Sequence, residues 1–283
     1  MEAAVVGSER CRVAVLADIH GNLVALRAVL ADLDAENVDG IVVAGDMVGF
    51  GPSPDEVVDL LVERNAQMIR GNHEKDYVAV YGTPQMPDEW RTAARTRSLL
   101  WTMERLGPGR RAMLASLPDR RLLDSSTVVV HGSPRSVRDS IFEWTSEPEL
   151  TAMLEGEESR LVLVGHTHRA LTREIPGRRI VNVGSVGFPL DGDTRATYAI
   201  ATPSDDGQTG SLNVSIRRVA YDIDAAVAAF DGGLGQADPC FLEVLARQLR
   251  TGRSLIGAWV RASDGLAVEE LPDALARFLR EQA

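Results

Sequence analysis

The chain has 283 residues, of which 45% are hydrophobic and 25% charged, so it can bury a sizeable core in one large α/β domain with appendages. Its formal net charge of −11 argues against long nucleic acid as a partner, because that binding needs clustered lysine and arginine. The N-terminus lacks the pattern of a secretory signal, and no stretch approaches the roughly 20 apolar residues of a membrane span. We therefore expect a cytoplasmic protein without a membrane partner, in which Cys11 and Cys240 remain thiols.

Five apolar runs of strand length each stop directly before a polar motif. The predicted strands are residues 13–17, 41–44, 67–69, 128–130 and 161–164. The residues that follow them are Asp18, Gly45-Asp46, Gly71-Asn72-His73, His131 and Gly165-His166. Ligands of α/β sheets bind outside the carboxyl ends of the strands. We therefore expect these motifs to meet at one rim, although they are far apart in the sequence.

Helical patterns alternate with the first strands. Residues 22–36 place leucines on one face behind a capping Asn22, and residues 55–64 follow the helix-start pair Ser53-Pro54. This alternation predicts a sheet with much parallel character.

The segment 88–116 interrupts the alternation and predicts two helices divided near Gly107. Two interpretations stay open for this insertion, which spans about 86–117. It either covers the active site and helps to select substrates, or it packs Trp101 and its leucines into the core while its arginines face solvent.

The second half of the chain predicts three more strands, at residues 179–183, 197–201 and 212–219, which we assign to a second sheet. A polar hairpin turn is expected at residues 204–210. Helical patterns at residues 224–230, 240–249 and 271–279 then close the chain.

All five histidines lie in short motifs that can present them to a metal ion. A carboxylate has two oxygens and can bridge two ions, which suits Asp46. One predicted ion is held by Asp18, His20, Asp46 and His168, and the other by Asp46, Asn72, His131 and His166. Such a pair, roughly 3.5 to 4 Å apart, would activate a bridging water and clamp a phosphoryl group. Because only two ligands are negative, the site keeps a positive field for a phosphate anion.

This arrangement resembles the calcineurin-like metallophosphoesterase superfamily, whose pattern is Asp-x-His, Gly-Asp, Gly-Asn-His-Asp/Glu, His and Gly-His-x-His in that order. Residues 46–54 and 184–189 are also similar to segments of its small bacterial and archaeal phosphodiesterase-like branch. The resemblance covers residues 11–253 and leaves 254–283 as a C-terminal helical extension. It implies an α/β fold, a four-layer αββα sandwich of two stacked mixed β-sheets flanked by helices.

The resemblance also implies a catalytic role for His73, the histidine that the ligand sets leave over. In the family this position donates a proton to the leaving group, oriented by the following acidic residue, here Glu74. Such catalysis contributes ~10² to 10⁴ in rate, and a neighbouring carboxylate would raise the pKa of His73. Arg70 is expected to reach the substrate phosphate. Tyr77, Trp90 and Trp144 either stack on a nucleobase or belong to the core.

The function implied is hydrolysis of a small phosphate ester or nucleotide by a metal-bridging hydroxide, with a phosphodiesterase or nucleotide hydrolase as the leading hypothesis. A Ser/Thr-type phosphoprotein phosphatase and a diadenosine tetraphosphate hydrolase are the alternatives. A non-catalytic protein-binding scaffold is disfavoured, because every motif residue is retained. Two divalent ions are expected, Mn²⁺ first and Fe, Zn, Ni or Co as alternatives. The oligomeric state is left open, a dimer included.

Overall fold

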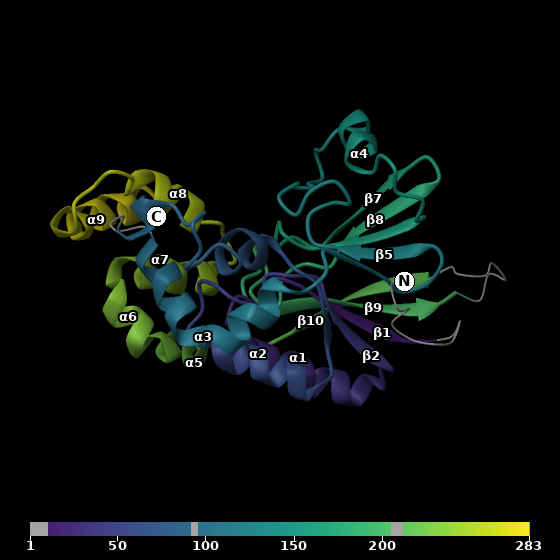
Figure 1. Cartoon of the computed structure of the whole chain (residues 1–283), viewed down its shortest axis with the longest axis horizontal. Coiled ribbons are helices and arrows are strands. Elements are labelled where there is room, and N and C mark those ends of the chain that lie inside the picture. Colours follow the sequence, from purple (N-terminus) through teal and green to yellow (C-terminus); the bar gives the residue numbers. More distant parts are fainter. Residues whose placement is uncertain (1–10, 92–95, 205–211, 283) are drawn as a thin grey trace.

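The structure, a computed structural model, describes residues 11–91, 96–204 and 212–282. Two five-stranded sheets lie face to face, with helices on both outer faces (Figure 1). This confirms the four-layer sandwich that the sequence resemblance implies. Among the described residues, none of the helices combines the length and the apolar character needed to cross a bilayer.

The first sheet has the strand order β10-β9-β1-β2-β3. Its parallel part consists of β1 (Val13–Leu16), β2 (Gly40–Val43) and β3 (Gln67–Met68). Two antiparallel strands extend it, namely β9 (Ala196–Pro203) and β10 (Leu212–Val219). The three strands at the start of the sequence thus share a direction and end at the same edge.

The second sheet has the order β4-β5-β6-β8-β7. Its parallel centre consists of β5 (Thr127–Val130), β6 (Leu161–Val164) and β8 (Arg178–Asn182). The antiparallel edges are β4 (Arg120–Leu122) and β7 (Leu171–Ile175). Neither edge strand was predicted, because both are short and partly exposed and lack a continuous apolar run.

The predicted placement of the last strands was partly wrong. Only β8 joins the second sheet, whereas β9 and β10 complete the first one. β9 fills the edge of β1 that β2 leaves open, with Val13 opposite Ala201 and Val15 opposite Ala199. Strand propensity reports that a segment is extended, but it does not report which edge the segment will pair with. The predicted hairpin turn falls almost entirely on residues outside the described ranges.

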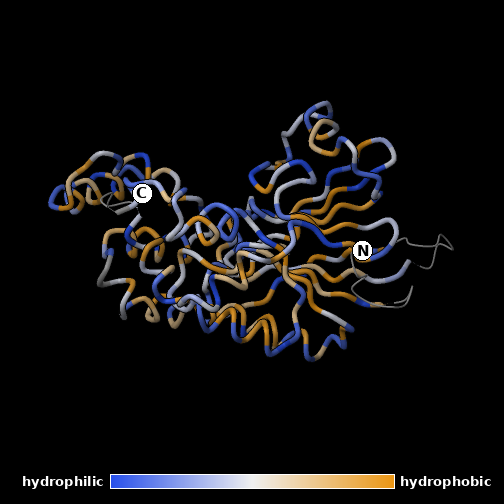
Figure 2. Tube along the Cα trace, in the orientation of Figure 1, coloured by the Kyte–Doolittle hydropathy of each residue, from blue (hydrophilic) through white to orange (hydrophobic). Residues whose placement is uncertain are grey.

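Three apolar layers hold the sandwich together. Alternate residues of β1 divide between them, with Val13 and Val15 packed between the sheets and Ala14 and Leu16 packed under helices. The helices on the first sheet are α1 (Leu23–Glu36), α2 (Pro54–Glu63) and α3 (Arg97–Ala115). The second sheet is covered by α4 (Glu147–Met153). Figure 2 shows the hydrophobic residues concentrated along the strands and the inner sides of these helices.

Local signals in the sequence account for the helix boundaries. Asn22 caps α1 as predicted, since its side-chain oxygen accepts from Ala25 N at 3.1 Å. The insertion contains a 3₁₀ helix, η2 (Asp88–Arg91), and α3, whose helical path breaks at Gly107 with φ 69° and ψ 167°. The predicted division near Gly107 is therefore confirmed.

The last part of the chain folds into a group of helices beside the sandwich (Figure 1). These are α5 (Ile223–Ala228), η4 (Ala229–Asp231), α6 (Gly233–Ala237), α7 (Pro239–Thr251), α8 (Ile256–Ala262), η5 (Val268–Glu270) and α9 (Leu271–Glu281). They share one apolar cluster, which Phe188 also joins and which we call the C-terminal cluster. The cluster spans the predicted boundary at residue 254, because Phe241 and Leu245 of α7 pack with Trp259 of α8 and Phe278 of α9. A domain division at that residue stays a prediction.

Candidate metal centre

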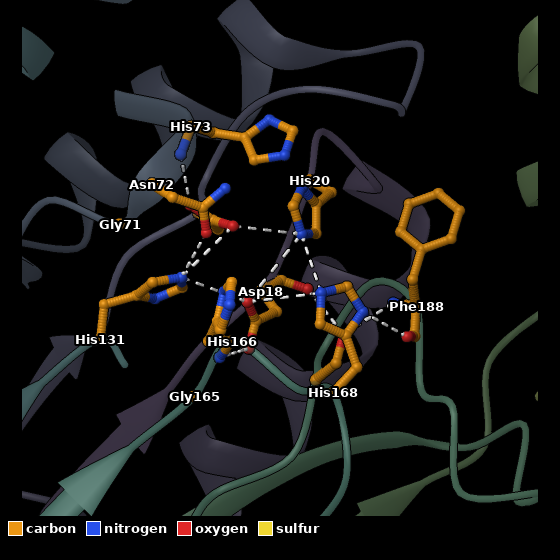
Figure 3. Close-up of polar contacts among 12 residues, drawn as sticks. Asp18, His20, Gly71, Asn72, His73, His131, Gly165, His166, His168 and Phe188 are labelled. Atoms are coloured by element: carbon orange, nitrogen blue, oxygen red, sulfur yellow. Dashed lines mark hydrogen bonds and ion pairs between the residues drawn. The ribbon is translucent and has the colours of Figure 1, made fainter. Parts of the chain in front are cut away.

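The carboxyl ends of β1, β2, β3, β5 and β6 meet at one edge, as the sequence predicted. Three groups of side chains there each place their ligand atoms within 4.8 Å of one another. They are Asp18, His20 and His168; Asp46, His131 and His166; and His20, Asp46 and His73. Figure 3 shows Asp18 and the five histidines of these groups. The first two groups bring together residues that the sequence assigned to each ion, and the third includes His73, which the sequence left over.

The first group forms what we call the closed half-site, because Asp18, His20 and His168 are all buried. The Nε2 atoms of the two histidines lie 3.0 Å apart. Asp18 Oδ1 is 3.4 Å from His168 Nε2 and 3.9 Å from His20 Nε2.

The second group, with Asn72, forms what we call the open half-site, because Asn72 and His166 are partly exposed. His131 Nε2 lies 3.1 Å from Asn72 Oδ1. The rings of His131 and His166 are 5.1 Å apart between centroids. Asn72 thus joins His131 and His166, as predicted.

Asp46 lies between the two half-sites. Its Oδ2 is 3.6 Å from His20 Nε2 and 3.4 Å from His131 Nε2. Its Oδ1 accepts a hydrogen bond from the backbone N of His73 at 2.8 Å, which fixes the orientation of the carboxylate. One oxygen is therefore held by the backbone and the other faces histidines of both half-sites.

The chemistry of the closed half-site fits a cation. His20 Nδ1 lies 3.2 Å from Val48 O and His168 Nδ1 lies 2.7 Å from Phe188 O, and a carbonyl can only accept, so both Nδ1 atoms carry hydrogen. Burial lowers the pKa of His168 to about 4, so its ring is neutral. Two neutral rings then direct lone pairs at each other across 3.0 Å. A metal ion held by both rings would remove this repulsion, and the two carbonyls would then be the outer partners that metal-binding histidines need.

Asp18 supports the same conclusion. Its Oδ2 accepts from the backbone N of His166 at 2.9 Å. Its Oδ1 is fully buried and has no hydrogen-bond partner among the described residues, although His168, His20 and His131 Nε2 lie 3.4, 3.9 and 4.0 Å away. A buried carboxylate oxygen without a donor is costly, and a metal ion at this point would satisfy it.

The open half-site fits a cation for a similar reason. His131 Nδ1 donates to Ala44 O at 2.7 Å, which leaves Nε2 facing the oxygens of Asp46 and Asn72. Burial opposes a charged ring, but the nearby carboxylates of Asp46 and Asp18 outweigh it and raise the pKa of His131 to about 10. In this state a proton on Nε2 supplies positive charge among acceptors. A divalent ion would supply it instead.

The backbone is strained at the same places. Eight non-glycine residues in the described ranges have positive φ, and five of them are predicted ligands: Asp18, His20, Asp46, His166 and His168. Such left-handed conformations are uncommon outside glycine and cluster at functional sites. The sharp turns they create aim each side chain from a strand end into the centre.

Glu74 has a different role from the one predicted. Its carboxylate accepts from the backbone N atoms of Asp46, Met47 and Gly71 at 2.9, 3.0 and 2.9 Å. These three bonds join the loops that follow β2 and β3. Glu74 therefore holds the loop of Asp46 in place, and the expectation that it orients the His73 ring is wrong. Burial and the neighbouring Asp46 raise the pKa of Glu74 to about 7.

His73 lies at the centre, at the start of η1 (His73–Val78), a π-helix. Its ring centroid is 4.6 Å from that of His20, 4.8 Å from Phe50 and 5.1 Å from Tyr77. Burial lowers the pKa of His73 although Asp46 and Asp76 act in the opposite direction, so the predicted rise is wrong. A Cβ on Gly49 would collide with Nδ1, which explains the glycine at that position.

Arg70 and the aromatic residues that the sequence suggested for substrate binding all contact other side chains of the protein. The Arg70 guanidinium donates to Asp119 Oδ1 and to Ala115 O, so it is committed to neighbours, and its contact with substrate stays a prediction. The Tyr77 ring packs against Trp90 at 5.6 Å. Trp144 is 72% exposed and stacks on Phe142 with the ring planes 7° apart.

The contacts of α3 agree with the interpretation that the insertion packs into the core with its arginines outward, and a role in covering the active site stays a prediction. Trp101 of α3 packs against the C-terminal cluster, and Arg105 and Arg110 form exposed ion pairs with Asp55 and Asp59. Trp90, in contrast, lies one ring away from His73, through Tyr77.

Comparison with known proteins identifies the family. The profile of the calcineurin-like phosphoesterase superfamily domain matches residues 11–206. The chain is 32% identical to a metallophosphoesterase from Sphaerobacter thermophilus, with a TM-score of 0.68 over 86% of this chain and 99% of that one. A hypothetical protein from Pyrococcus horikoshii is 26% identical, with a TM-score of 0.65 over 83% of this chain and 97% of that one.

A third relative is an uncharacterized protein from Methanocaldococcus jannaschii. It is 29% identical over 232 residues, which cover 76% of this chain and 89% of the relative. The chain therefore belongs to the calcineurin-like phosphoesterase superfamily and is a phosphoric ester hydrolase of the metallophosphoesterase type. Divalent metal ions follow from the family and from the three overlapping groups of possible ligands.

Proposed function

We propose that the protein hydrolyses small phosphate esters with two divalent metal ions, and that phosphodiesters or nucleotides are its main substrates. The observation that carries the proposal is the position of Asp46, whose Oδ2 lies within 3.6 Å of histidines from both half-sites. One carboxylate oxygen facing two sets of ligands is the arrangement that a pair of ions requires. Mn²⁺ is the ion we propose first, with Fe, Zn, Ni and Co as alternatives, since imidazole and carboxylate ligands bind all of them.

The residues of the chain have distinct tasks in this reaction. Bound ions supply the positive charge that activates a water and stabilises the phosphoryl oxygens. Asp18, His20 and His168 would hold one ion, and Asn72, His131 and His166 the other, with Asp46 shared. Glu74 keeps the Asp46 loop in register through its bonds to backbone amides. A rigid, largely buried set of ligands keeps its geometry when the substrate binds.

His73 is the proposed proton donor to the leaving group. Two observations support this role: the His73 ring lies 4.6 Å from that of His20, and its Nδ1 has no hydrogen-bond partner among the described residues. His73 is also within reach of an ion held by His20 and Asp46, so the metal content of its variants distinguishes the two roles. A poor leaving group needs this proton far more than a good one does. The leaving groups of diesters and nucleotides are alkoxides or phosphates, so their departure is assisted by this proton.

A phosphoprotein phosphatase and a diadenosine tetraphosphate hydrolase remain the alternatives, since the same centre can serve all of these reactions. The Tyr77–Trp90 pair beside His73 favours an aromatic or nucleotide leaving group over a phosphoprotein. A cytoplasmic location is proposed because Cys11 and Cys240 are not joined in a disulfide.

The decisive experiment is a substrate panel with metal reconstitution. The purified protein is loaded with Mn²⁺ and given p-nitrophenyl phosphate, bis-p-nitrophenyl phosphate, cyclic nucleotides, dinucleoside polyphosphates and a phosphopeptide. We expect cleavage of diesters or nucleotides, with about two ions bound per chain by elemental analysis. Absence of any cleavage under these conditions would refute the proposal.

The role of His73 is tested with leaving groups of graded basicity. His73→Ala should retain both ions and lose about 10² to 10⁴ in rate for the poorest leaving groups, with much smaller losses for p-nitrophenolate. His73→Gln controls for volume. An equal loss across all leaving groups would show that His73 is not the acid.

A further inference from the structure

The exposure of the ligands shows from which side a substrate reaches the metals. Asp18, His20, Asp46, His131 and His168 are buried. Asn72 and His166 are partly exposed, and both belong to the open half-site. A substrate phosphate must therefore approach between these two residues, which Figure 3 shows on the side away from Phe188.

One arginine lies close to His166 and pairs with a residue of the helix that begins at His73. Arg138 belongs to the loop after β5, and its backbone lies close to the ring of His166. Its Nε donates to Asp76 Oδ2 at 2.6 Å. Asp76 lies on η1, three residues beyond His73. The Arg138 side chain therefore links the loop after β5, which lies beside His166, to the helix that begins at His73.

The loop that carries Arg138 is held firmly. Ser133 Oγ donates to Asp139 Oδ2 at 2.6 Å, and Arg135 donates to the same carboxylate through Nε and Nη2 at 2.9 Å each. A Cβ on Gly132 would lie 2.6 Å from Ser136 O, so the loop folds closely over its own start. The backbone of Arg138 is therefore placed by rigid neighbours while its side chain is 69% exposed.

The bond to Asp76 is suited to exchange. Exposed ion pairs contribute little to stability, because water screens them and both side chains lose rotamer freedom. Arg138 uses only Nε in this pair, and within the described part of the chain Nη1 and Nη2 have no side-chain partner. Arg70, in contrast, is bound through Nε, Nη1 and Nη2. Nη1 and Nη2 of Arg138 can therefore donate hydrogen bonds to an anion, whereas all three guanidinium nitrogens of Arg70 already have partners.

We propose that Arg138 binds a second anionic group of the substrate, on the leaving-group side of the scissile phosphorus, and that Asp76 holds the guanidinium there until substrate arrives. The preferred substrates are phosphoric esters or anhydrides whose leaving group itself carries a phosphate, as in nucleoside polyphosphates. This inference rests on the proposed function, since the leaving-group side is defined by His73. A guanidinium suits this task because it meets two phosphate oxygens at once.

The test compares substrates with and without a charged leaving group. Arg138→Ala, loaded with Mn²⁺, is assayed on ADP and diadenosine tetraphosphate and on bis-p-nitrophenyl phosphate. We expect KM to rise about 10- to 100-fold for the first two and by less than about twofold for the third. Arg138→Lys should recover part of the loss, and Asp76→Asn should lower KM for the charged substrates.

A matched control is Arg195→Ala, which removes another exposed arginine, 52% exposed and paired with Asp193. It should change no KM. Calorimetry with inorganic pyrophosphate and Mn²⁺-loaded protein gives a readout without turnover, and Arg138→Ala should weaken this binding by a similar factor. Equal KM changes for all substrates, or none, would overturn the inference while leaving the proposed function intact. A wild-type protein that cleaves none of them would overturn the proposed function, and this inference with it.

Discussion

The two half-sites differ in what surrounds them. The closed half-site is backed by aromatic residues: the Phe50 ring lies 4.8 Å from His20 and 6.1 Å from Phe241, and Phe188 lies 6.0 Å from His20. Through these rings it rests on the C-terminal cluster. The open half-site is backed by the loop of residues 132–139, which is held by polar contacts and ion pairs.

Because of this difference, the two half-sites are suited to different tasks: one to retaining a metal ion and the other to binding the substrate. A buried, apolar surround keeps water away from ligands and makes loss of an ion costly. A partly exposed surround allows the substrate to replace water at the metal. The closed half-site is therefore suited to retain its ion, and the open half-site to exchange ligands during turnover. Four predictions test this contrast, in order of decreasing effect on the centre.

The largest effect is expected from Asp46, the residue that both half-sites share. Asp46→Asn keeps the shape but removes the charge that faces both sets of histidines. It should lower the metal content well below two ions per chain and reduce activity at least about 10³-fold, more than the 10- to 100-fold typical of an outer partner. Elemental analysis and initial rates measure both. Asp59→Asn, an exposed carboxylate, is the control. Two retained ions would contradict the bridging role.

Removing one histidine from each half-site should give unequal results. His166→Ala leaves the buried ligands intact, so one ion should survive dialysis against a weak chelator. His168→Ala opens the closed half-site and should leave little tightly bound metal. In the wild-type protein the same treatment should remove one ion at least about 10-fold faster than the other. Metal content against time of dialysis measures this, and a single common rate would remove the distinction between the half-sites.

The C-terminal cluster should act on the closed half-site alone. Phe241→Ala deletes a buried ring that contacts Phe50, and should lower the free energy of unfolding by about 3 kcal/mol. The retained ion should bind about 10-fold more weakly, as expected when an outer support of a ligand is lost. Phe241→Leu, which keeps most of the volume, should lie close to the wild type. If Phe241→Ala lowered the stability but left the affinity for both ions unchanged, the C-terminal helices would not support the metal ligands.

The smallest effect concerns acid and the loop of the open half-site. Burial tends to raise the pKa of Asp139, but its bonds to Arg135 and Ser133 prevail and hold it below its usual value of 3.8. A depressed pKa contributes stability above pH 3.8 and loses it as the pH falls through the lower folded value. Because water reaches the Arg135 side chain, which is 48% exposed, we expect about 0.5 kcal/mol or less.

Urea unfolding of the metal-free protein at pH 5 and pH 3 measures this contribution. Asp139→Asn should lose less stability between these pH values than the wild type does. An equal loss of stability in the variant and in the wild type would show that the Asp139 carboxylate does not stabilise the loop.

Much of the centre follows from the sequence because the ligands are attached to strand ends. The runs that became β1, β2, β5 and β6 are mostly apolar and rich in valine, whereas β3 is only Gln67–Met68; all five end within one or two residues of the predicted position. Parallel strands in one sheet end at the same edge, which places the motifs after β1, β2 and β3 together and those after β5 and β6 together. The stacking of the two sheets then brings these two sets of motifs to one site. The order of the motifs then distinguishes the predicted metal ligands from His73.

Other features depend on contacts that no local pattern encodes. The pairing of β9 with β1 is a choice between edges, and Glu74 binds amides 27 and 28 residues away in the sequence. Arg138 follows His131 by seven positions in an ordinary polar loop, and only the chain fold brings it opposite Asp76. The left-handed turns at Asp18 and His166 are likewise imposed by the surrounding structure.

The sequence by itself determined the strand ends, the ligand types and hence the class of reaction, because side-chain chemistry and the two-residue period of strands are local properties. Tertiary structure decided which ligands are buried, which face solvent, and which arginine lies close to His166. Burial and charge pairing are sums over neighbours from distant parts of the chain. They exist only once the two sheets and the C-terminal helices have packed together.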